Sequence, residues 1–299
     1  MLELRSGTRS QEEPVQLQKA MKKPTGGGRK LTRGLPLLAG VCWLVIAAYP
    51  IYYMVISSFR TPAGFLSESP WVPEGASSLE NYATVINGGI GLYFVNSLFV
   101  TGVSVALITV VSLLAAYAIT RVRSRTVLWV FNAFLLGLAV PYQAAIIPIF
   151  VIINKMGLYD TLYGLIPPQV AFHIPLTVLI LVNFIRDIPT ELYDSMVLDG
   201  AGHFRLLQQL VLPLSRPALI TVIIYNSVQV WNNFLFPLIL TQSSNVRTIP
   251  LALREFQGEY GVNVPGIMAA VILSVLPIVV LYVVARRQLL GGLIAGFGK

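Results

Sequence analysis

Long stretches without any charged side chain alternate with short charged segments along the chain. Six such stretches cover residues 34–59, 81–120, 126–154, 161–185, 217–246 and 260–285. An α-helix rises about 1.5 Å per residue, so about 20 apolar residues cross the hydrocarbon layer of a membrane. Five stretches fit one crossing each, and the polar start of the longest one places its helix from near Leu92. The pattern predicts an all-α membrane protein with six transmembrane helices.

The composition agrees with a chain that faces lipid. Of its 299 residues, 55% are hydrophobic and 11% are charged, and the mean hydropathy is +0.72. Soluble domains carry about 25% charged residues, so this chain has too few to cover a water-facing surface. Its single cysteine, Cys42, excludes an internal disulfide and a thiolate metal cluster.

Lysine and arginine placement predicts the orientation. The segments 1–33, 121–125, 186–216 and 286–299 hold 17 of the 21 basic residues. Because cytoplasmic loops are enriched in these residues, we expect all four segments and both termini to be cytoplasmic. The net charge of +8 therefore reflects membrane topology rather than nucleic-acid binding.

Residues 1–33 combine scattered charges with Pro24 and three consecutive glycines, which predicts a disordered basic cytoplasmic tail. The apolar run that follows has 26 residues, longer than the core of a cleaved signal peptide, so we expect a retained helix. The glycines lack the Gly-Lys-Ser/Thr ending of a phosphate loop, and no ATP site is recognisable in the chain.

The segment 186–216 is the longest of the cytoplasmic loops. Pro189 ends the preceding helix, and Thr190 is a candidate N-cap for a short helix that stops at Gly200. A second short helix is expected from His203 to Leu212, ended by Pro213. From these residues alone, an interfacial amphipathic segment is an equally good interpretation.

The same loop resembles the "EAA" loop of bacterial ABC importer permeases. That pattern falls on Asp194-Ser195-Met196, Gly200, Leu210 and Leu212-Pro213, with the spacing kept and the first triplet degenerate. Further stretches resemble the carbohydrate-uptake subclass, in particular the six-helix subunit of maltose-type systems: Pro141-Tyr-Gln143, Gly157-Leu158, Leu198-Asp-Gly-Ala201, Trp231-Asn232 and Phe256-Gln257-Gly258. The resemblance implies an ABC type-1-like transmembrane domain over 34–299.

This resemblance implies a coupling helix that docks on a separate ATPase subunit, which holds ATP and Mg²⁺, with no cofactor and no catalytic residue in this chain. It also implies a second permease subunit in a heterodimer, two ATPase copies, an extracytoplasmic solute-binding protein and a sugar substrate. For Gly200, a plain helix stop is the alternative. The implied coupling residues are Leu192, Asp194, Ser195, Met196, Asp199, Gly200, Phe204 and Pro213.

Polar residues in the fifth stretch mark a candidate solute path. Asn226, Gln229 and Asn233 recur at helical spacing on one face, with Trp231 and Asn232 beside them. Amides donate and accept hydrogen bonds at once, which suits hydroxyl-rich sugars. Interhelical hydrogen bonding is the alternative for each residue. His173, in the fourth stretch, is interpreted as a packed residue rather than a ligand.

The loop 247–264 precedes the last helix and faces outward in the predicted topology. In similar subunits this region approaches the solute-binding protein, and an ordinary loop is the alternative. The candidate contact residues are Arg254, Phe256, Gln257 and Tyr260.

Three other functions stay open. A secondary transporter predicts intramembrane charges or broken inverted repeats, and neither is visible. A membrane enzyme needs a catalytic cluster, but His173 and His203 fall in different compartments. An ABC permease for another solute, such as a polyamine or glycerol-phosphate, is the closest competitor.

Overall fold

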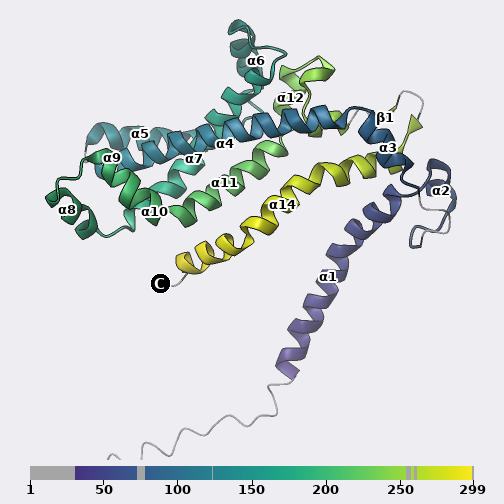
Figure 1. The fold of residues 1–299 in the computed structure, drawn as a ribbon, viewed down its shortest axis with the longest axis horizontal. Coiled ribbons are helices and arrows are strands. Elements are labelled where there is room, and N and C mark those ends of the chain that lie inside the picture. Colours follow the sequence, from purple (N-terminus) through teal and green to yellow (C-terminus); the bar gives the residue numbers. More distant parts are fainter. Residues whose placement is uncertain (1–30, 73–77, 123, 254–256, 259–260, 298–299) are drawn as a thin grey trace, which may run out of the picture. The chain divides into compact units, whose positions relative to one another are not determined.

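A computed structural model describes residues 31–72, 78–122, 124–253, 257–258 and 261–297 (Figure 1). The predicted tail thus lies outside the described residues up to residue 30, and α1 (Leu31–Ser58) begins within its last three positions. The chain divides into two units, Met1–Tyr52 and Tyr53–Lys299. In the first unit, the described residues form the apolar first part of α1, which exposes side chains such as Trp43.

The described chain is almost entirely helical. Four helices are long and apolar enough to cross a membrane by length and composition: Pro36–Ser58 of α1, α4 (Ile90–Arg121), α7 (Leu162–Arg186) and Val264–Val284 of α14 (Val264–Phe297). A fifth candidate combines His203–Leu214 with α11 (Arg216–Trp231), which meet at a bend of 75°. These helices fall on five of the six expected stretches.

Two expected crossings are interrupted. Residues 126–154 form α5 (Arg125–Gly137) and α6 (Ile146–Lys155), separated by turns around Pro141. Residues 217–246 form α11 and α12 (Leu235–Leu240), separated after Trp231. Proline cannot donate a backbone hydrogen bond, which favours such interruptions. The count of six transmembrane helices therefore stays a prediction.

Short elements complete the second unit. They are α2 (Pro62–Ser67), α3 (Glu80–Asn87), α8 (Thr190–Leu198), α9 (His203–Leu206), a π-helix (Leu207–Val211), α10 (Leu212–Leu214), a 3₁₀ turn (Ser244–Val246) and α13 (Ile249–Ala252). A two-residue antiparallel ladder pairs β1 (Gln257–Gly258) with β2 (Gly261–Val262), in the register Gln257↔Val262.

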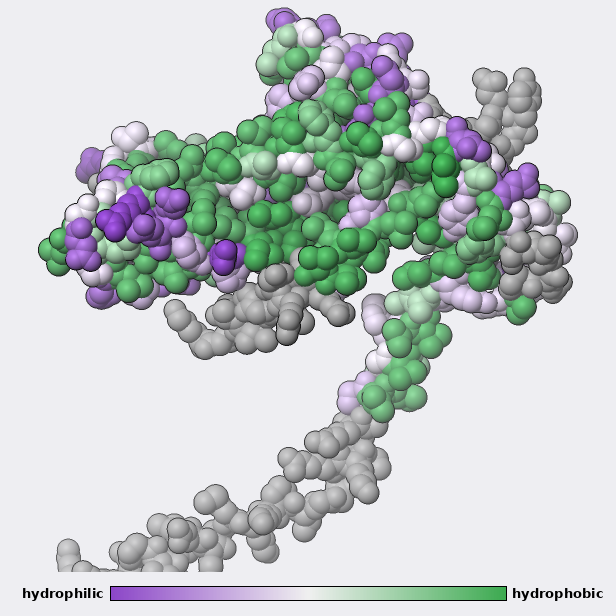
Figure 2. All heavy atoms as spheres, in the orientation of Figure 1, coloured by the Kyte–Doolittle hydropathy of each residue, from purple (hydrophilic) through white to green (hydrophobic). Residues whose placement is uncertain are grey.

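The core of the second unit lies where α4 packs along α7 and α11 (Figure 1). Small hydroxyl side chains line the buried side of α4, including Ser97, Ser104 and Ser112. Small residues allow helix backbones to approach closely, which is how helices associate in lipid. Figure 2 shows apolar side chains over the surface of these helices, while hydrophilic residues gather near the helix ends.

Asp160 links the loop before α7 to the loop after α12, at the end of α7 that lies away from α8. Its carboxylate accepts hydrogen bonds from the backbone N–H of Gln242 (2.8 Å) and Ser243 (2.9 Å) and from the Ser243 hydroxyl. Its own N–H donates to the carbonyl of Leu240 at 2.9 Å. The residue holds a left-handed backbone, with φ of 56°. This set of bonds joins the start of α7 to the end of α12.

These bonds predict a pH-dependent stability. The Ser243 hydroxyl, followed by the N–H groups of Gln242 and Ser243, lowers the pKa of the Asp160 carboxyl. A lowered pKa in the folded state stabilises the fold above the unfolded-state value of about 3.9, and this stability is lost as pH falls through the folded-state pKa. In Asp160→Asn, we expect a lower melting temperature than wild type at pH 7.

The difference should shrink as the pH is lowered below about 4, where the carboxylate is being protonated. Asparagine tolerates the left-handed backbone, so this substitution tests the charge and not the turn. Asp187→Asn, an identical change at an exposed position, is the control. Thermal unfolding in detergent measures both variants, and a pH-independent difference for Asp160→Asn would contradict the role of the carboxylate.

Candidate functional site

The segment between α7 and α11 forms two short helices at an angle, as expected. Pro189, rather than Thr190, occupies the N-cap of α8, without a side-chain cap hydrogen bond. At the other end, Gly200 has φ of +78°. The N–H of Gly200 donates to the Val197 carbonyl, and that of Ala201 donates to the Met196 carbonyl, both at 2.9 Å. This is a Schellman motif, so the helix-stop interpretation of Gly200 describes its local geometry.

The second short helix was predicted to end at Pro213, but it runs past this residue. The backbone stays helical through Leu214 and turns at Ser215. A proline ring inside an α-helix collides with the carbonyl four residues earlier. Here the preceding turn is a π-helix, in which the Leu212 N–H bonds the Leu207 carbonyl, and this wider turn accommodates Pro213.

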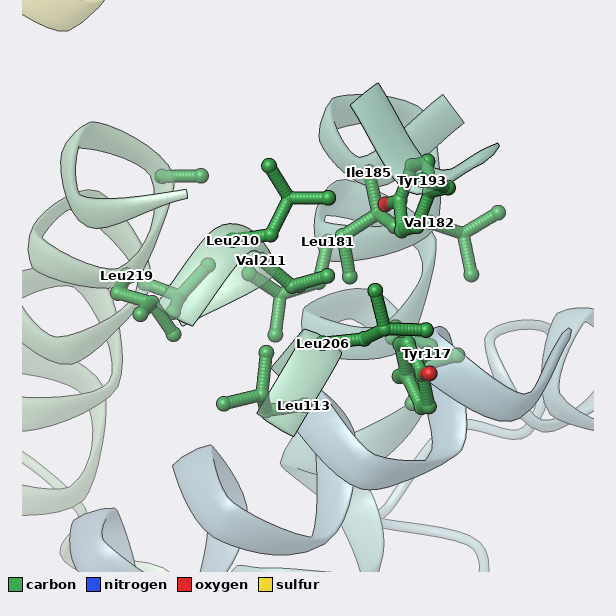
Figure 3. Packing of buried hydrophobic residues seen from close by; sticks show 14 of the residues in the cluster. Leu113, Tyr117, Leu181, Val182, Ile185, Tyr193, Leu206, Leu210, Val211 and Leu219 are labelled. Carbon is green, nitrogen blue, oxygen red and sulfur yellow. The ribbon is translucent and has the colours of Figure 1, made fainter. Parts of the chain in front are cut away.

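An inner face anchors this segment to the membrane helices, as Figure 3 shows. Tyr193 is 2% exposed, and the Arg121 guanidinium lies 4.0 Å from the centre of its ring. The Tyr117 hydroxyl and His203 Nδ1 are 3.0 Å apart. The buried residues of the segment include Tyr193, Leu206, Leu210 and Val211. They pack against a cluster on α4 and α7 that includes Leu113, Tyr117, Leu181, Val182 and Ile185.

An outer face of the same segment is exposed. Of the predicted coupling residues, Met196 is half-buried against the core, whereas the others are exposed: Leu192, Asp194, Ser195, Asp199, Gly200, Phe204 and Pro213. Leu198 and Phe204 are 88% and 76% exposed, which is unusual for large apolar side chains outside lipid. Leu198 was not among the candidates, although its place beside Gly200 was a usable signal.

A cavity of about 560 Å³ lies beside the middle of α7. Phe172, His173 and Leu176 of α7 line it, about halfway along this 25-residue helix. Residues of α5, α11 and α12 and of the interruptions after α5 and after α11 form the rest of its wall. Non-helical backbone is tolerated at membrane depth where it lines a polar cavity. The cavity therefore explains how the two helix interruptions can occur within apolar stretches.

Three predicted path residues line this cavity, namely Gln229, Asn232 and Asn233. Aromatic residues that were not among the predicted path residues also line the cavity: Tyr142, Phe172, Tyr225, Phe234 and Phe236. His173, interpreted as a packed residue, lies in the wall as well, and its Nδ1 is 2.7 Å from the Gln169 carbonyl. The cavity thus combines amides, an imidazole and aromatic rings.

The two other path candidates lie elsewhere. Asn226 is fully buried, and its Nδ2 donates to Thr177 Oγ1 of α7 at 3.0 Å. Trp231 is buried beside Phe94 of α4, and its Nε1 donates to the Ser274 carbonyl of α14 at 3.1 Å. Both side chains therefore connect helices, which is the alternative considered for them.

The predicted common face of Asn226, Gln229 and Asn233 is interrupted because α11 ends at Trp231. Asn233 lies in the break, where its Oδ1 accepts a hydrogen bond from the Phe236 N–H at 3.0 Å. Of the candidate contacts to a binding protein, Arg254, Phe256 and Tyr260 lie outside the described residues, and Gln257 belongs to β1.

Known proteins share this fold over most of its length. A solved bacterial ABC transporter chain involved in import of the acidic polysaccharide alginate superposes with a TM-score of 0.76 at 18% identity, covering 89% of this chain and 99% of that one. This likeness shows that the two chains share a fold.

Sequence comparison defines the family. A Caldicellulosiruptor protein named as an ABC transporter permease is 39% identical over 86% of this chain and 94% of its own. The diacetylchitobiose uptake permease of Streptomyces coelicolor is 32% identical, over 86% and 85%. The trehalose/maltose permease of Thermococcus litoralis is 31% identical, over 89% and 96%.

Residues 108–290 match the family described as binding-protein-dependent transport system inner membrane component. The chain belongs to this family of ABC importer permeases, and the resemblance drawn from the loop 186–216 is confirmed.

The bond between Asn226 and Thr177 predicts a structural role without a transport role. In Thr177→Val, the buried amide of Asn226 loses its partner, and we expect a loss of about 0.6–2 kcal/mol in stability. Valine matches threonine in shape, so the loss isolates the hydroxyl. Thermal unfolding in detergent measures the stability, and transport in vesicles should keep its apparent affinity for solute. A changed affinity would place Thr177 in the path after all.

Proposed function

We propose that this chain forms half of the translocation path of an ABC importer for a sugar or oligosaccharide. A separate ATPase subunit, present in two copies and holding ATP and Mg²⁺, powers the transport. A second permease subunit completes the path, and an extracytoplasmic protein delivers the solute. Relatives named for diacetylchitobiose uptake and trehalose/maltose transport support the sugar assignment.

The proposed topology has six crossings, two of them built from the interrupted pairs α5–α6 and α11–α12. Both termini and the loop 186–216 are then cytoplasmic, as the distribution of lysine and arginine favours. A solved relative by fold, with a TM-score of 0.66 at 16% identity, is in complex with a periplasmic protein carrying an alginate pentasaccharide. This supports an extracytoplasmic partner for the present chain.

The cavity beside α7 is the observation that carries the proposal. It lies about 15 Å or more from either end of α7, at the depth of a bilayer centre. Its described lining includes no Asp, Glu, Lys or Arg, while Gln229 and Asn232 offer donors and acceptors together. A neutral polyhydroxylated solute fits this lining. Polyamines and glycerol-phosphate would each need an opposite charge, which the described wall does not supply.

The cavity predicts which amides set solute affinity. In the double variant Gln229→Leu and Asn232→Leu, we expect the apparent affinity for sugar to fall about tenfold or more, because two hydrogen-bonding groups are lost. ATP turnover of the reconstituted complex is measured with maltose or diacetylchitobiose as the stimulating solute. Thr177→Val, which removes a polar group outside the cavity, is the matched control. Equal responses of the two variants would exclude the cavity as the path.

The exposed face of α8 and α9 supports docking of the ATPase on this segment. The apolar side chains of Leu198 and Phe204 and the carboxylates of Asp194 and Asp199 are all exposed on this segment, uncovered by the described residues. The opposite face is fixed on α4 and α7 through Tyr193 and its neighbours. A segment with one face bound to membrane helices and the other free can transmit the movement of a docked subunit.

Gly200 allows a sharp test of docking. A Cβ at this position meets no atom within 4 Å, and both Asn and Asp tolerate the left-handed backbone. We expect Gly200→Asp to separate ATP hydrolysis from sugar uptake, because it adds a charge at the proposed contact with the ATPase. Gly200→Asn has nearly the same shape and should retain most of the coupling. The ratio of sugar imported to ATP hydrolysed in vesicles measures the effect. A wild-type ratio for Gly200→Asp would contradict docking of the ATPase at this position.

A further inference from the structure

A second polar cavity, of about 330 Å³, lies where the ends of α4 and α7 meet the start of α8. Its wall is formed by Thr120 and Arg121 of α4, Ile185 and Arg186 of α7, and the residues around Tyr193 on α8. It is separate from the solute cavity, with which it shares no lining residue. At about 30 Å³ for each water molecule, it has room for a small polar group.

Two guanidinium groups line this cavity, and neither has a carboxylate partner among the described residues. Arg121 lies over the ring of Tyr193, and Arg186 lies 5.4 Å from the ring centre of Phe131. Within the described parts of the chain, neither guanidinium forms a hydrogen bond or an ion pair within 4.0 Å. Asp194 also lines the cavity, so the two arginines and one carboxylate leave one net positive charge.

A buried hydroxyl in the same wall also lacks a partner. Tyr193 is 2% exposed, and its hydroxyl oxygen makes no hydrogen bond among the described residues. A buried unpaired hydroxyl is costly, and Tyr193 lines the cavity, so an acceptor bound there that takes its hydrogen bond would remove this cost. Burial raises the pKa of this phenol, more than Arg121 lowers it, so the hydroxyl keeps its proton and can donate.

The start of α8 adds a third group of donors. This nine-residue helix has Pro189 at its N-cap and no side-chain cap hydrogen bond. Its first-turn N–H groups therefore lack the usual side-chain acceptor, and the positive end of the helix dipole lies beside the cavity. Thr190 in this first turn belongs to the cavity wall. Arginine forks, a phenol and a helix start are the groups that bind phosphate.

We propose that this cavity binds the phosphate of an anionic phospholipid headgroup. Its place between the ends of two membrane helices, under the polar segment, is typical of headgroup sites. Large apolar side chains on neighbouring α5 are exposed and suited to acyl chains, with Leu128 at 58% and Trp129 at 75%. Tryptophan is enriched at the level of the headgroups. Only the assignment of the lipid to the cytoplasmic leaflet depends on the topology given under the proposed function.

Native mass spectrometry of the full-length chain in detergent tests the proposal. Phosphatidylglycerol and phosphatidylcholine of equal chain length are added, and bound lipid is counted. We expect the wild-type chain to retain phosphatidylglycerol preferentially. The double variant Arg121→Gln and Arg186→Gln should bind it about tenfold or more weakly, because two charged donors are lost. Arg216→Gln, the same change at an exposed arginine outside the cavity, should behave as wild type.

Tyr193→Phe keeps the buried ring and removes only the hydroxyl. We expect this variant to fold normally but to bind phosphatidylglycerol severalfold more weakly than the wild-type chain. Equal retention of both lipids by the wild-type chain would overturn the proposal, as would equal losses in the double variant and in Arg216→Gln. Inorganic phosphate at millimolar concentration distinguishes the source of the phosphate. We expect it not to displace the lipid, and displacement would overturn the assignment to lipid. The experiment counts bound lipid and does not involve sugar uptake, so its result is independent of the proposed solute path.

Discussion

Backbone N–H and C=O groups find no water partner in hydrocarbon, and this constraint governs where the membrane helices can break. Between α5 and α6 and between α11 and α12, the helical bonding is interrupted within stretches without charges. Both interruptions meet the same cavity, in which Asn233 bonds the Phe236 N–H directly. The polar interior is thus a requirement of the broken helices as well as the proposed place for solute.

The segment 190–214, proposed as the docking segment, shows the opposite arrangement. From α9 through the π-helix to α10 its backbone stays helical, although the geometry is irregular. The π turn before Pro213 keeps Leu206, Leu210 and Val211 on one inward face. In a regular α-helix the ring of Pro213 would collide with the carbonyl of Gln209, and the wider π turn removes this collision. A rigid segment follows, with its outer surface determined by its inner packing.

The sequence was enough to predict four of the membrane helices, the two-helix form of the loop and the stop at Gly200, because each depends on local composition or on one special backbone angle. The broken spans were not predicted, since hydropathy reports apolar content and not helical continuity. Tyr193 was missed for a different reason. Both faces of α8 carry apolar side chains, so its pattern does not show which face is inward until α4 and α7 are in place.

Helix α7 connects the two regions to which we assign functions, the cavity and the proposed docking segment. Its middle bears Phe172 and His173 in the cavity wall, and its end leads through Arg186 into α8. Pro175 lies between them and packs beside Gly137, where α5 ends. Proline removes one backbone bond, so α7 has a point of bending where it lines the cavity, ahead of the proposed docking segment. A movement of α8 would therefore act on the side of the cavity formed by α5 and α7, while Asp160 holds the far end of α7 to α12.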